Sequence, residues 1–371
     1  TFSKQEVDAC LKKPIFEFYP IHIVSAFHNY ELLGELVLFG IDVNTRTERR
    51  PHYTPLSLAI ANDMENENLD KEDRLSPRDQ TVTKLLENGA LPNICDETGG
   101  SPLYVACYKG LDSTVQILLN NGAKVNLCEI TGTSPLYMAC KNGYDITVQL
   151  LINNGADTNL CRMTGESPLH IACQNGHNRT MQILVDNGAD LNLCDETGRS
   201  PLFIACQYGH DSTVQFLLNN GADVNLCKIT GESPLNIACK YKHENTVTLL
   251  LNNGADMNLC ENAGTSPLYV ACKRGFNSIV QQLINKGANV NLFEKRGDSP
   301  LYIASKIGFE SLVHHLINNG AEVNLCNMTG VSPLFIACYN GHQRTVKVLL
   351  NQGADVNLRE EKGISPLYLA C

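Results

Sequence analysis

Apolar residues recur along this chain in a short pattern that predicts pairs of helices. In one segment, Leu136, Ala139 and Cys140 fall at positions i, i+3 and i+4, which places them on one face of a helix. A second stripe with the same spacing begins at Val148. Polar stretches that contain glycine separate the stripes. The pattern therefore predicts two short amphipathic helices followed by an extended, turn-rich connection.

Residues with known preferences for helix ends bracket these stripes. Ser134 is a good N-cap, and Pro135 follows at the first helical position, where its missing N–H leaves no bond unmade. Gly143 ends the first helix because glycine tolerates left-handed backbone geometry, and an Asn-Gly pair ends the second helix. Residues 156–165 are short and turn-rich, as a hairpin that links successive helix pairs should be.

This segment is one copy of a repeat that occupies most of the chain. The repeat extends upstream of the first Ser-Pro-Leu tripeptide, through Thr54-Pro55 and Tyr19-Pro20. The intervals between these successive prolines are 47 and 35 residues. We predict ten full repeats and the start of an eleventh. The Ser-Pro-Leu tripeptide recurs every 33 residues, with its prolines at Pro102, Pro135, Pro168, Pro201, Pro234, Pro267, Pro300, Pro333 and Pro366.

The full pattern, G-x-[ST]-P-L-x-x-A-x-x-x-G…LL-x-x-G-A-D-V-N, resembles the ankyrin repeat over residues 17–371. Two short helices and a hairpin cannot bury an apolar face alone, so such repeats must stack on one another. The resemblance implies an all-α ankyrin-repeat solenoid, in which helix–turn–helix repeats linked by β-hairpins form a curved superhelical stack. Residues 1–16 would be an N-terminal flank.

The second repeat is longer than the others. Its extra residues lie within 63–80, an acidic segment poor in large apolar side chains, which we expect to be a solvated loop. The simplest interpretation is a tolerated surface insertion. The alternative is a docking or regulatory loop with Ser76-Pro77 as a phosphorylation site.

The two ends of the array depart from the pattern in different ways. Tyr19 replaces the capping serine in the first repeat, which we expect to close the stack as a cap. The last repeat stops inside its first helix at Cys371, so we expect a monomeric array within a longer protein.

Two neighbouring repeats have Gln282 and His315 at a second-helix position that is apolar in other repeats. We interpret these polar residues as drift at a half-exposed site or, alternatively, as a lateral contact surface.

Charge and motifs exclude several classes of function. The chain has 29 Lys plus Arg against 39 Asp plus Glu, a net charge of -10, so nucleic acid is not an expected partner. No apolar run reaches the roughly 18 residues that span a membrane, and residues 1–10 lack the basic-then-apolar pattern of a signal peptide. We therefore expect a cytoplasmic location without membrane insertion. Nucleotide, zinc-protease and serine-hydrolase motifs are absent, so we predict no enzymatic activity, no cofactor and no metal.

Sixteen cysteines follow the period of the repeat in two ladders. Equivalent residues of stacked helices lie about 8–10 Å apart, which exceeds the roughly 7 Å that a disulfide allows, and no CxxC is present for zinc. We interpret the helix ladder as small buried hydrophobes and the hairpin ladder as filling, with redox sensitivity as the alternative. The helix ladder is Cys107, Cys140, Cys173, Cys206, Cys239, Cys272, Cys338 and Cys371, and the hairpin ladder is Cys95, Cys128, Cys161, Cys194, Cys227, Cys260 and Cys326.

Four histidines also follow the repeat, and they resemble a structural loop residue more than a proton relay. They occupy one position, at the start of the second helix: His177, His210, His243 and His342.

The resemblance implies that partners bind on the concave surface, at hairpin tips and first-helix ends. We predict a protein–protein interaction scaffold or adaptor. The alternatives are the substrate-targeting arm of a larger enzyme (a ubiquitin ligase or kinase) and the cytosolic ankyrin domain of a membrane-skeleton linker or channel. A basic strip on this surface, within the acidic chain, favours acidic segments of other proteins as partners. The strip consists of Lys240, Lys273, Arg274 and Lys306, and the other predicted partner-binding residues are Tyr108, Lys109, Ile130, Lys141, Met163, Gln174, Gln207, Tyr208, Ile229, Tyr241, Met328 and Tyr339.

The same resemblance implies a modification, because hairpin asparagines of ankyrin repeats can be substrates of an asparaginyl hydroxylase. A structural role, holding the hairpin by side-chain hydrogen bonds, is enough to explain these residues. The matching positions are Asn126, Asn159, Asn192, Asn225, Asn258, Asn291, Asn324 and Asn357.

Overall fold

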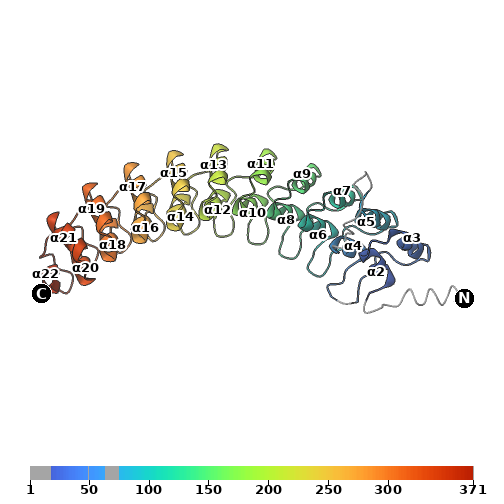
Figure 1. Ribbon diagram of the computed structural model, residues 1–371, viewed down its shortest axis with the longest axis horizontal. Helices are drawn as coiled ribbons and strands as arrows, with labels where there is room; N and C mark the ends of the chain where they lie inside the picture. Colours follow the sequence, from blue (N-terminus) through green and yellow to red (C-terminus); the bar gives the residue numbers. More distant parts are fainter. Residues whose placement is uncertain (1–17, 49, 63–74, 371) are drawn as a thin grey trace. The chain divides into compact units, whose positions relative to one another are not determined.

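The computed structural model describes residues 18–48, 50–62 and 75–370, and the regular structure in them is helical (Figure 1). The predicted N-terminal flank, 1–16, lies outside these residues. The chain divides into two compact units, Thr1–Asp190 and Leu191–Cys371, called unit 1 and unit 2 below. The all-α prediction is confirmed.

Each unit contains five helix pairs within its described residues, and unit 2 ends with one further helix. The pairs of unit 1 are α2 (Pro20–Ala26) with α3 (Tyr30–Leu38), α4 (Pro55–Ala61) with α5 (Pro77–Glu87), α6 (Pro102–Lys109) with α7 (Asp112–Asn120), α8 (Pro135–Asn142) with α9 (Asp145–Asn153), and α10 (Pro168–Asn175) with α11 (Asn178–Asp186). The pairs of unit 2 are α12 (Pro201–Tyr208) with α13 (Asp211–Asn219), α14 (Pro234–Tyr241) with α15 (Glu244–Asn252), α16 (Pro267–Arg274) with α17 (Asn277–Asn285), α18 (Pro300–Ile307) with α19 (Glu310–Asn318), and α20 (Pro333–Tyr339) with α21 (Gln343–Asn351), followed by α22 (Pro366–Ala370).

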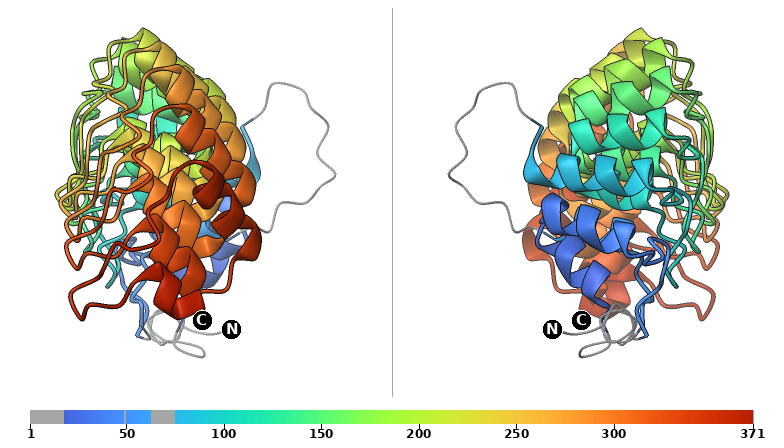
Figure 2. Two further views of the ribbon diagram at one scale, coloured as in Figure 1. Left: turned by 90° about the vertical axis from the view of Figure 1, so that its left-hand side faces the viewer. Right: turned by 90° about the vertical axis from the view of Figure 1, so that its right-hand side faces the viewer.

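Within each unit the helices form two layers. First helices pack on the first helices of neighbouring repeats, as α14 does on α16, and second helices pack on second helices, as α13 does on α15. The connections between repeats gather along one side of the helices of unit 2 in both views of Figure 2. They project beyond the first-helix layer, which therefore forms the wall behind them (Figure 1).

The predicted stripes form the core because their residues face neighbouring repeats. Leu136, Ala139 and Cys140 are fully or almost fully buried, as are Val148 and Leu151 of the second helix. The small side chains of Ala139 and Cys140 allow adjacent first helices to approach closely. Burial of these stripes between repeats, and not the intrinsic helix propensity of such short segments, holds the helices in place.

Predicted helix caps are present. The Ser134 hydroxyl accepts a hydrogen bond from the Tyr137 N–H at 3.1 Å, and the same bond recurs at serine N-caps in other repeats. The predicted β-hairpins, however, are short turns and not regular strands in the described residues. Each connection closes with a bond such as Glu129 N–H to Thr133 O (3.1 Å) and then turns into the next helix, so it is too short for a ladder. These segments are called hairpins below.

The expected loop at 63–80 needs a correction at its C-terminal end. Pro77 to Gln80 belong to α5, and the Ser76 hydroxyl accepts the Asp79 N–H at 3.1 Å as the N-cap. The Ser-Pro pair therefore starts a helix here, as it does in the first helices. Asp79 is buried and accepts hydrogen bonds from the hydroxyls of Ser113 (2.5 Å) and Thr114 (2.6 Å). Residues 63–74 lie outside the described part of the chain.

A buried threonine in the second helix bonds to the preceding repeat, a contact that was not predicted from the sequence. The Thr180 hydroxyl donates to the Asp145 carboxylate at 2.6 Å, and Thr246 donates to Asp211 at 2.5 Å. Both threonines are fully buried, so each hydroxyl needs a partner, and the carboxylate at the start of the previous second helix supplies it.

The threonine contact is interrupted in α17 and α19, the helices that carry Gln282 and His315. Ile279 and Leu312 replace the threonine there and are buried. Gln282 and His315 are both half-buried, and Gln282 accepts the hydroxyl of Thr248 at 3.0 Å. In these two helices, an apolar residue therefore replaces the buried threonine, and a polar residue replaces an apolar one at the half-buried position. Drift and lateral contact both remain interpretations of this change.

The first repeat is capped by a buried histidine instead of serine. His22 accepts the Tyr19 N–H at Nδ1 (3.2 Å), and its Nε2 donates to the Thr45 carbonyl oxygen (2.9 Å). This pattern requires the neutral ring. Burial lowers the pKa of His22, and the carbonyl bonds only partly oppose that effect.

We predict that the first repeat loses stability in mild acid. The folded pKa of His22 lies below its unfolded value of about 6.5, so stability is complete above that pH and decreases as the pH falls below it. Hydrogen exchange of α2 and α3 should accelerate in this range. His22→Asn, which introduces the residue found at the equivalent Asn236, should abolish most of the pH dependence. An identical pH profile in both proteins would contradict the assignment.

In unit 2, Lys242 stands where the other first helices that have this turn are followed by glycine. Lys242 has φ +64°, in the left-handed region, where the equivalent Gly275 has φ +71°. We expect Lys242→Gly to raise the free energy of unfolding by about 1 kcal/mol, because a side chain strains this conformation. Urea denaturation measures the change. The reverse substitution, Gly275→Ala, should be strongly destabilising, since its Cβ would lie 2.4 Å from the Phe309 ring. Equal stability of Lys242→Gly and the parent chain would contradict the strain.

Candidate functional site

Three hollows that share side chains form one trough along unit 2. Their volumes are about 600, 330 and 550 Å³, in chain order. The first and second share Glu232 and Lys240, and the second and third share Glu261, Tyr269 and Lys273. The trough extends from the hairpin before α12 to α18. One wall consists of hairpins and the other of the C-terminal turns of first helices.

Equivalent positions of successive first helices supply the apolar lining. Ile237, Val270 and Ile303 each contribute one branched side chain to one hollow. The exposed Ile229 on a hairpin and Tyr241 at the end of α14 complete the apolar surface of the first hollow. Ile229 is 70% exposed and Tyr241 is 50% exposed, so neither side chain is used for stacking of the repeats.

Most charges at the α12–α14 end of the trough are paired with one another, whereas the exposed Glu196 makes no ion pair within the described residues. The buried carboxylate of Glu232 binds two cations, Lys228 at 2.5 Å and Lys240 at 3.1 Å. On the preceding hairpin, Arg199 and Asp195 form an ion pair at 2.7 Å. Lys240 is therefore part of an internal ion network, and it is not the free member of a basic strip that its sequence position suggested.

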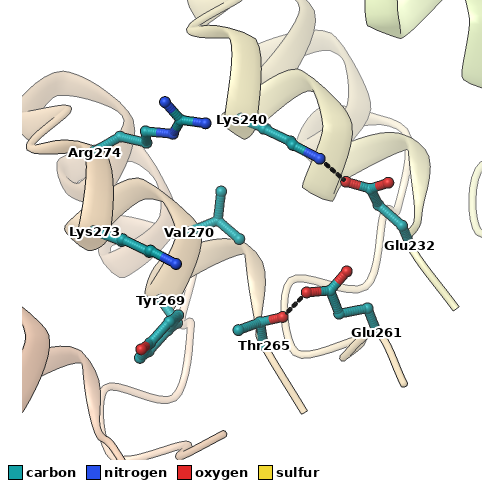
Figure 3. Close-up of a pocket in the computed structure, with 8 residues that line it drawn as sticks. All are labelled: Glu232, Lys240, Glu261, Thr265, Tyr269, Val270, Lys273 and Arg274. Carbon is teal, nitrogen blue, oxygen red and sulfur yellow. Dashed lines mark hydrogen bonds and ion pairs between the residues drawn. The ribbon is translucent and has the colours of Figure 1, made fainter. Parts of the chain in front are cut away.

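Opposite charges remain separated at the α16–α18 end. Lys273, Arg274 and Lys306 are exposed and make no ion pair within the described residues. Thr265 takes the place that Glu232 has one repeat earlier, so Lys273 lacks the carboxylate that Lys240 binds. Figure 3 shows Lys273 and Arg274 extending from α16 into the second hollow, with Glu261 on the hairpin opposite.

Three carboxylates line the hairpin wall at this end, together with the exposed cations Lys295 and Arg296. Glu261 accepts the hydroxyl of Thr265, and both its burial and the nearby Glu232 raise its pKa. Glu294 accepts the Arg296 N–H at 2.8 Å, and Asp298 accepts the Asn327 amide at 2.9 Å. Within the described residues none of the three carboxylates is in an ion pair. Burial, and to a smaller extent the carboxylates of Asp298 and Glu294, raise the pKa of Tyr302 to about 12.

Seven of the sixteen predicted partner-binding residues lie in the trough: Gln207, Ile229, Lys240, Tyr241, Lys273, Arg274 and Lys306. Tyr208 occupies the position of Tyr241 one repeat earlier, and its exposed ring stacks on His210. Met328 and Tyr339 are exposed in unit 2 but do not line these hollows.

In unit 1, Tyr108, Ile130 and Met163 are each more than half exposed, Lys141 is exposed and Gln174 is half-buried. Lys109 is less available than predicted, because its ammonium donates to the Ala61 carbonyl oxygen at 2.5 Å at the end of α4.

The carboxylates of the hairpin wall were not predicted from the sequence. Glu232, Glu261, Glu294 and Asp298 belong to the hairpins, which we had considered only at their tips. A signal was present: the position of Glu232 is held by Thr265 and then by Asp298 in the next two repeats, and each of the three stands eight residues before a lysine. The pairing between Glu232 and Lys240 follows from that spacing only once the hairpin is known to fold back on the helix.

A family model described as ankyrin repeats (3 copies) matches residues 76–161, 145–228, 235–325 and 301–371. The chain belongs to the ankyrin-repeat family. Comparison with curated proteins found no match. Ankyrin repeats are generally protein–protein interaction modules, and domains built from them are typically non-catalytic. No helix among the described residues is long and apolar enough to cross a membrane.

The hairpin asparagines of these ankyrin repeats bind the next repeat, and not their own hairpin as we had expected. The Asn291 amide donates to the Gly320 carbonyl oxygen at 3.1 Å, and its oxygen accepts the Glu322 N–H at 2.8 Å. Asn44 and Asn93, which we had not singled out, make the same two contacts. Asn126, Asn159, Asn225 and Asn324 repeat both bonds, whereas Asn192 and Asn258 are seen to accept the backbone N–H. Hydroxylation of these residues stays a prediction.

The loop histidines likewise connect ankyrin repeats, which confirms their structural interpretation. The Nε2 atoms of His177, His243 and His342 lie 3.2, 3.1 and 3.0 Å from carbonyl oxygens near the end of the first helix of the preceding repeat. Within the part of the chain that is described, no group of three His, Cys, Asp or Glu side chains is placed to hold a metal ion.

Both cysteine ladders are free thiols in the described residues. The helix ladder is buried as predicted, except that Cys338 is half-buried and Cys371 lies outside the described residues. Hairpin cysteines are half-buried, and those such as Cys161 and Cys227 donate their S–H to the carbonyl oxygen two residues earlier, at 3.4 and 3.3 Å. Burial raises the pKa of both thiols, which lowers their thiolate fraction and their reactivity.

We predict that the two hydrogen bonds from a hairpin asparagine to the next repeat stabilise the protein. Asn291→Ala leaves a carbonyl and an N–H of the next repeat without their partner, so the free energy of unfolding should fall by about 1–2 kcal/mol. The matched control is Asn357→Ala, since no inter-repeat bond of the Asn357 side chain is present in the described residues. This control should change stability by less than about 0.5 kcal/mol. Equal losses in urea denaturation would contradict the bridging role.

Proposed function

We propose that this ankyrin array is a scaffold or adaptor that binds a segment of another protein along the trough of unit 2. The observation that carries the proposal is the continuity of the three hollows over four successive first helices, α12 to α18. A surface of this kind accommodates an extended segment, whereas an isolated hollow of about 330 Å³ would hold only a few side chains.

The side chains of the trough support protein binding. Tyrosine and arginine are enriched among residues that dominate binding energy, and Tyr241 and Arg274 line the trough at equivalent positions on α14 and α16. Tyr208 holds the same position on α12, outside the lining of the three hollows. The apolar stripes are buried between repeats, whereas these exposed residues are available to contact a partner. The trough is open along its length, whereas catalysis requires convergent groups shielded from water.

The two alternatives named from the sequence use the same surface. A targeting arm of a ubiquitin ligase or kinase, and an ankyrin domain of a membrane-skeleton linker or channel, would each recognise their partner through hairpins and first helices. The scaffold proposal is preferred because it requires only the residues described.

Affinity capture from an extract of the source cells tests the proposal. The full chain should retain one or more proteins, and Tyr208→Ala combined with Tyr241→Ala should reduce their recovery at least about tenfold, as expected for loss of two aromatic anchors. The control combines Ile146→Ala with Leu350→Ala, which removes exposed apolar side chains from second helices. Equal recovery with the two double variants would exclude the trough as the binding surface.

A further inference from the structure

We propose that the α16–α18 end of the trough binds a segment in which two acidic residues are separated by two other residues. The segment lies along the trough in the polyproline II conformation, with both acidic side chains toward the first helices. The inference rests on the proposed function, because it specifies the partner of the same surface. It narrows the acidic segment suggested by the sequence to one part of the trough and to one spacing.

The first helices present only positive charge at this end. α16 and α18 contribute the cations Lys273, Arg274 and Lys306 to the second and third hollows, and no carboxylate from these two helices lines them. All three cations are exposed, and none is in an ion pair in the part of the chain that is described. A carboxylate of a partner that faces the first helices therefore meets unpaired positive charge alone.

The hairpin wall carries charges of both signs, which differ in exposure. Lys295 and Arg296 are exposed, whereas Glu261, Glu294 and Asp298 are half-buried. Each of the three carboxylates also accepts a hydrogen bond from the protein, as Glu294 does from the Arg296 N–H at 2.8 Å. Because the hairpin wall contains both signs, the first helices decide which charge the partner carries.

The α12–α14 end differs from this arrangement. Lys240 is equivalent to Lys273 and Lys306, but Glu232 binds its ammonium at 3.1 Å. The exposed Glu196 also lines the first hollow and is in no ion pair within the described residues. An acidic residue of the partner would meet a lysine that is already paired, and a carboxylate that repels it. We therefore place the acidic pair opposite Lys273 and Lys306.

The packing of α16 on α18 determines the spacing of the acidic pair. Lys273 and Lys306 hold equivalent positions on these helices, which pack at the buried Ala271 and Ala304, so their rows lie about 8–10 Å apart. Polyproline II rises about 3.1 Å per residue with three residues per turn, which places residues i and i+3 about 9 Å apart on one side. Residues on one side of a β-strand lie about 6.6 or 13 Å apart, and neither distance matches.

Selection from a displayed library of random linear peptides on the full chain tests the inference. Recovered peptides should be enriched in pairs of acidic residues with two residues between them. Synthetic copies are then compared with isomers of the same composition, in which the two acidic residues are two or four positions apart. In fluorescence anisotropy at about 0.1 M salt, the recovered spacing should bind roughly two- to fivefold more tightly, the effect of one exposed ion pair.

Variants of the two lysines locate the acidic pair. Lys273→Glu with Lys306→Glu should weaken these peptides at least about tenfold. Lys273→Gln with Lys306→Gln should weaken them less, because only the reversal of charge adds repulsion. The matched control is Arg344→Glu with Lys347→Glu on the exposed face of α21, which changes the net charge equally and should leave the affinity unchanged.

Glu232→Thr extends the test in the opposite direction. The variant introduces the residue found at the equivalent Thr265, and it frees Lys240 from its ion pair. A peptide with three acidic residues, each separated from the next by two residues, should bind this variant roughly two- to fivefold more tightly than it binds the parent chain. Equal affinities would show that the lysine row does not set the spacing.

The outcomes separate the inference from the function on which it rests. Peptides that require Tyr241 but lack the acidic pair, bind equally as isomers, or tolerate Lys273→Glu with Lys306→Glu would overturn the inference and leave the trough as the binding surface. A selection in which neither the tyrosine nor the lysine variants weaken any peptide would contradict the proposed function itself. Circular dichroism melting verifies that each variant is folded.

Discussion

Contact between successive repeats is the constraint on which the rest of this protein depends. A helix of seven to nine residues is too short to be stable alone, and a single helix pair leaves both of its sides exposed to water. Leucine and alanine stripes therefore bury themselves on the neighbouring repeat. The polar contacts obey the same rule: Thr246 bonds to the preceding repeat, and Asn291 bonds to the following one.

These contacts explain why so many positions are nearly constant and why function is restricted to the others. A residue that satisfies a neighbour, such as His243 at the carbonyl of Gln207, cannot also serve a partner. Positions whose side chains do not bond to a neighbouring repeat lie at hairpins and at the ends of first helices. Stacking of the repeats thus leaves the trough as one continuous exposed surface, and residues that differ between repeats lie there.

The charges of the residues that line the trough differ between successive repeats. The exchange of Glu232 for Thr265 in the next repeat frees Lys273 from the ion pair that holds Lys240. Conversely, Glu261 and Glu294 occupy the position that Lys228 has in the earlier repeat, so a carboxylate there replaces the cation that pairs with Glu232. Small substitutions at equivalent positions therefore change which charges of the trough are paired and which are not, without any change in the fold.

Local chemistry made the repeat predictable. The 33-residue period, the serine caps and the apolar stripes depend on residues close together in the chain, so helices, core and repeat boundaries followed directly. The helical start at Ser76 was missed because an acidic, irregular stretch precedes it. Contacts beyond a single helix or hairpin were not accessible to such reasoning. Asn291 to Gly320 and Lys109 to Ala61 join different repeats, and Lys240 to Glu232 joins a helix to the hairpin that precedes it. Which lysine is free and which carboxylate faces it depends on how a hairpin folds against a helix, and only the three-dimensional arrangement settles that.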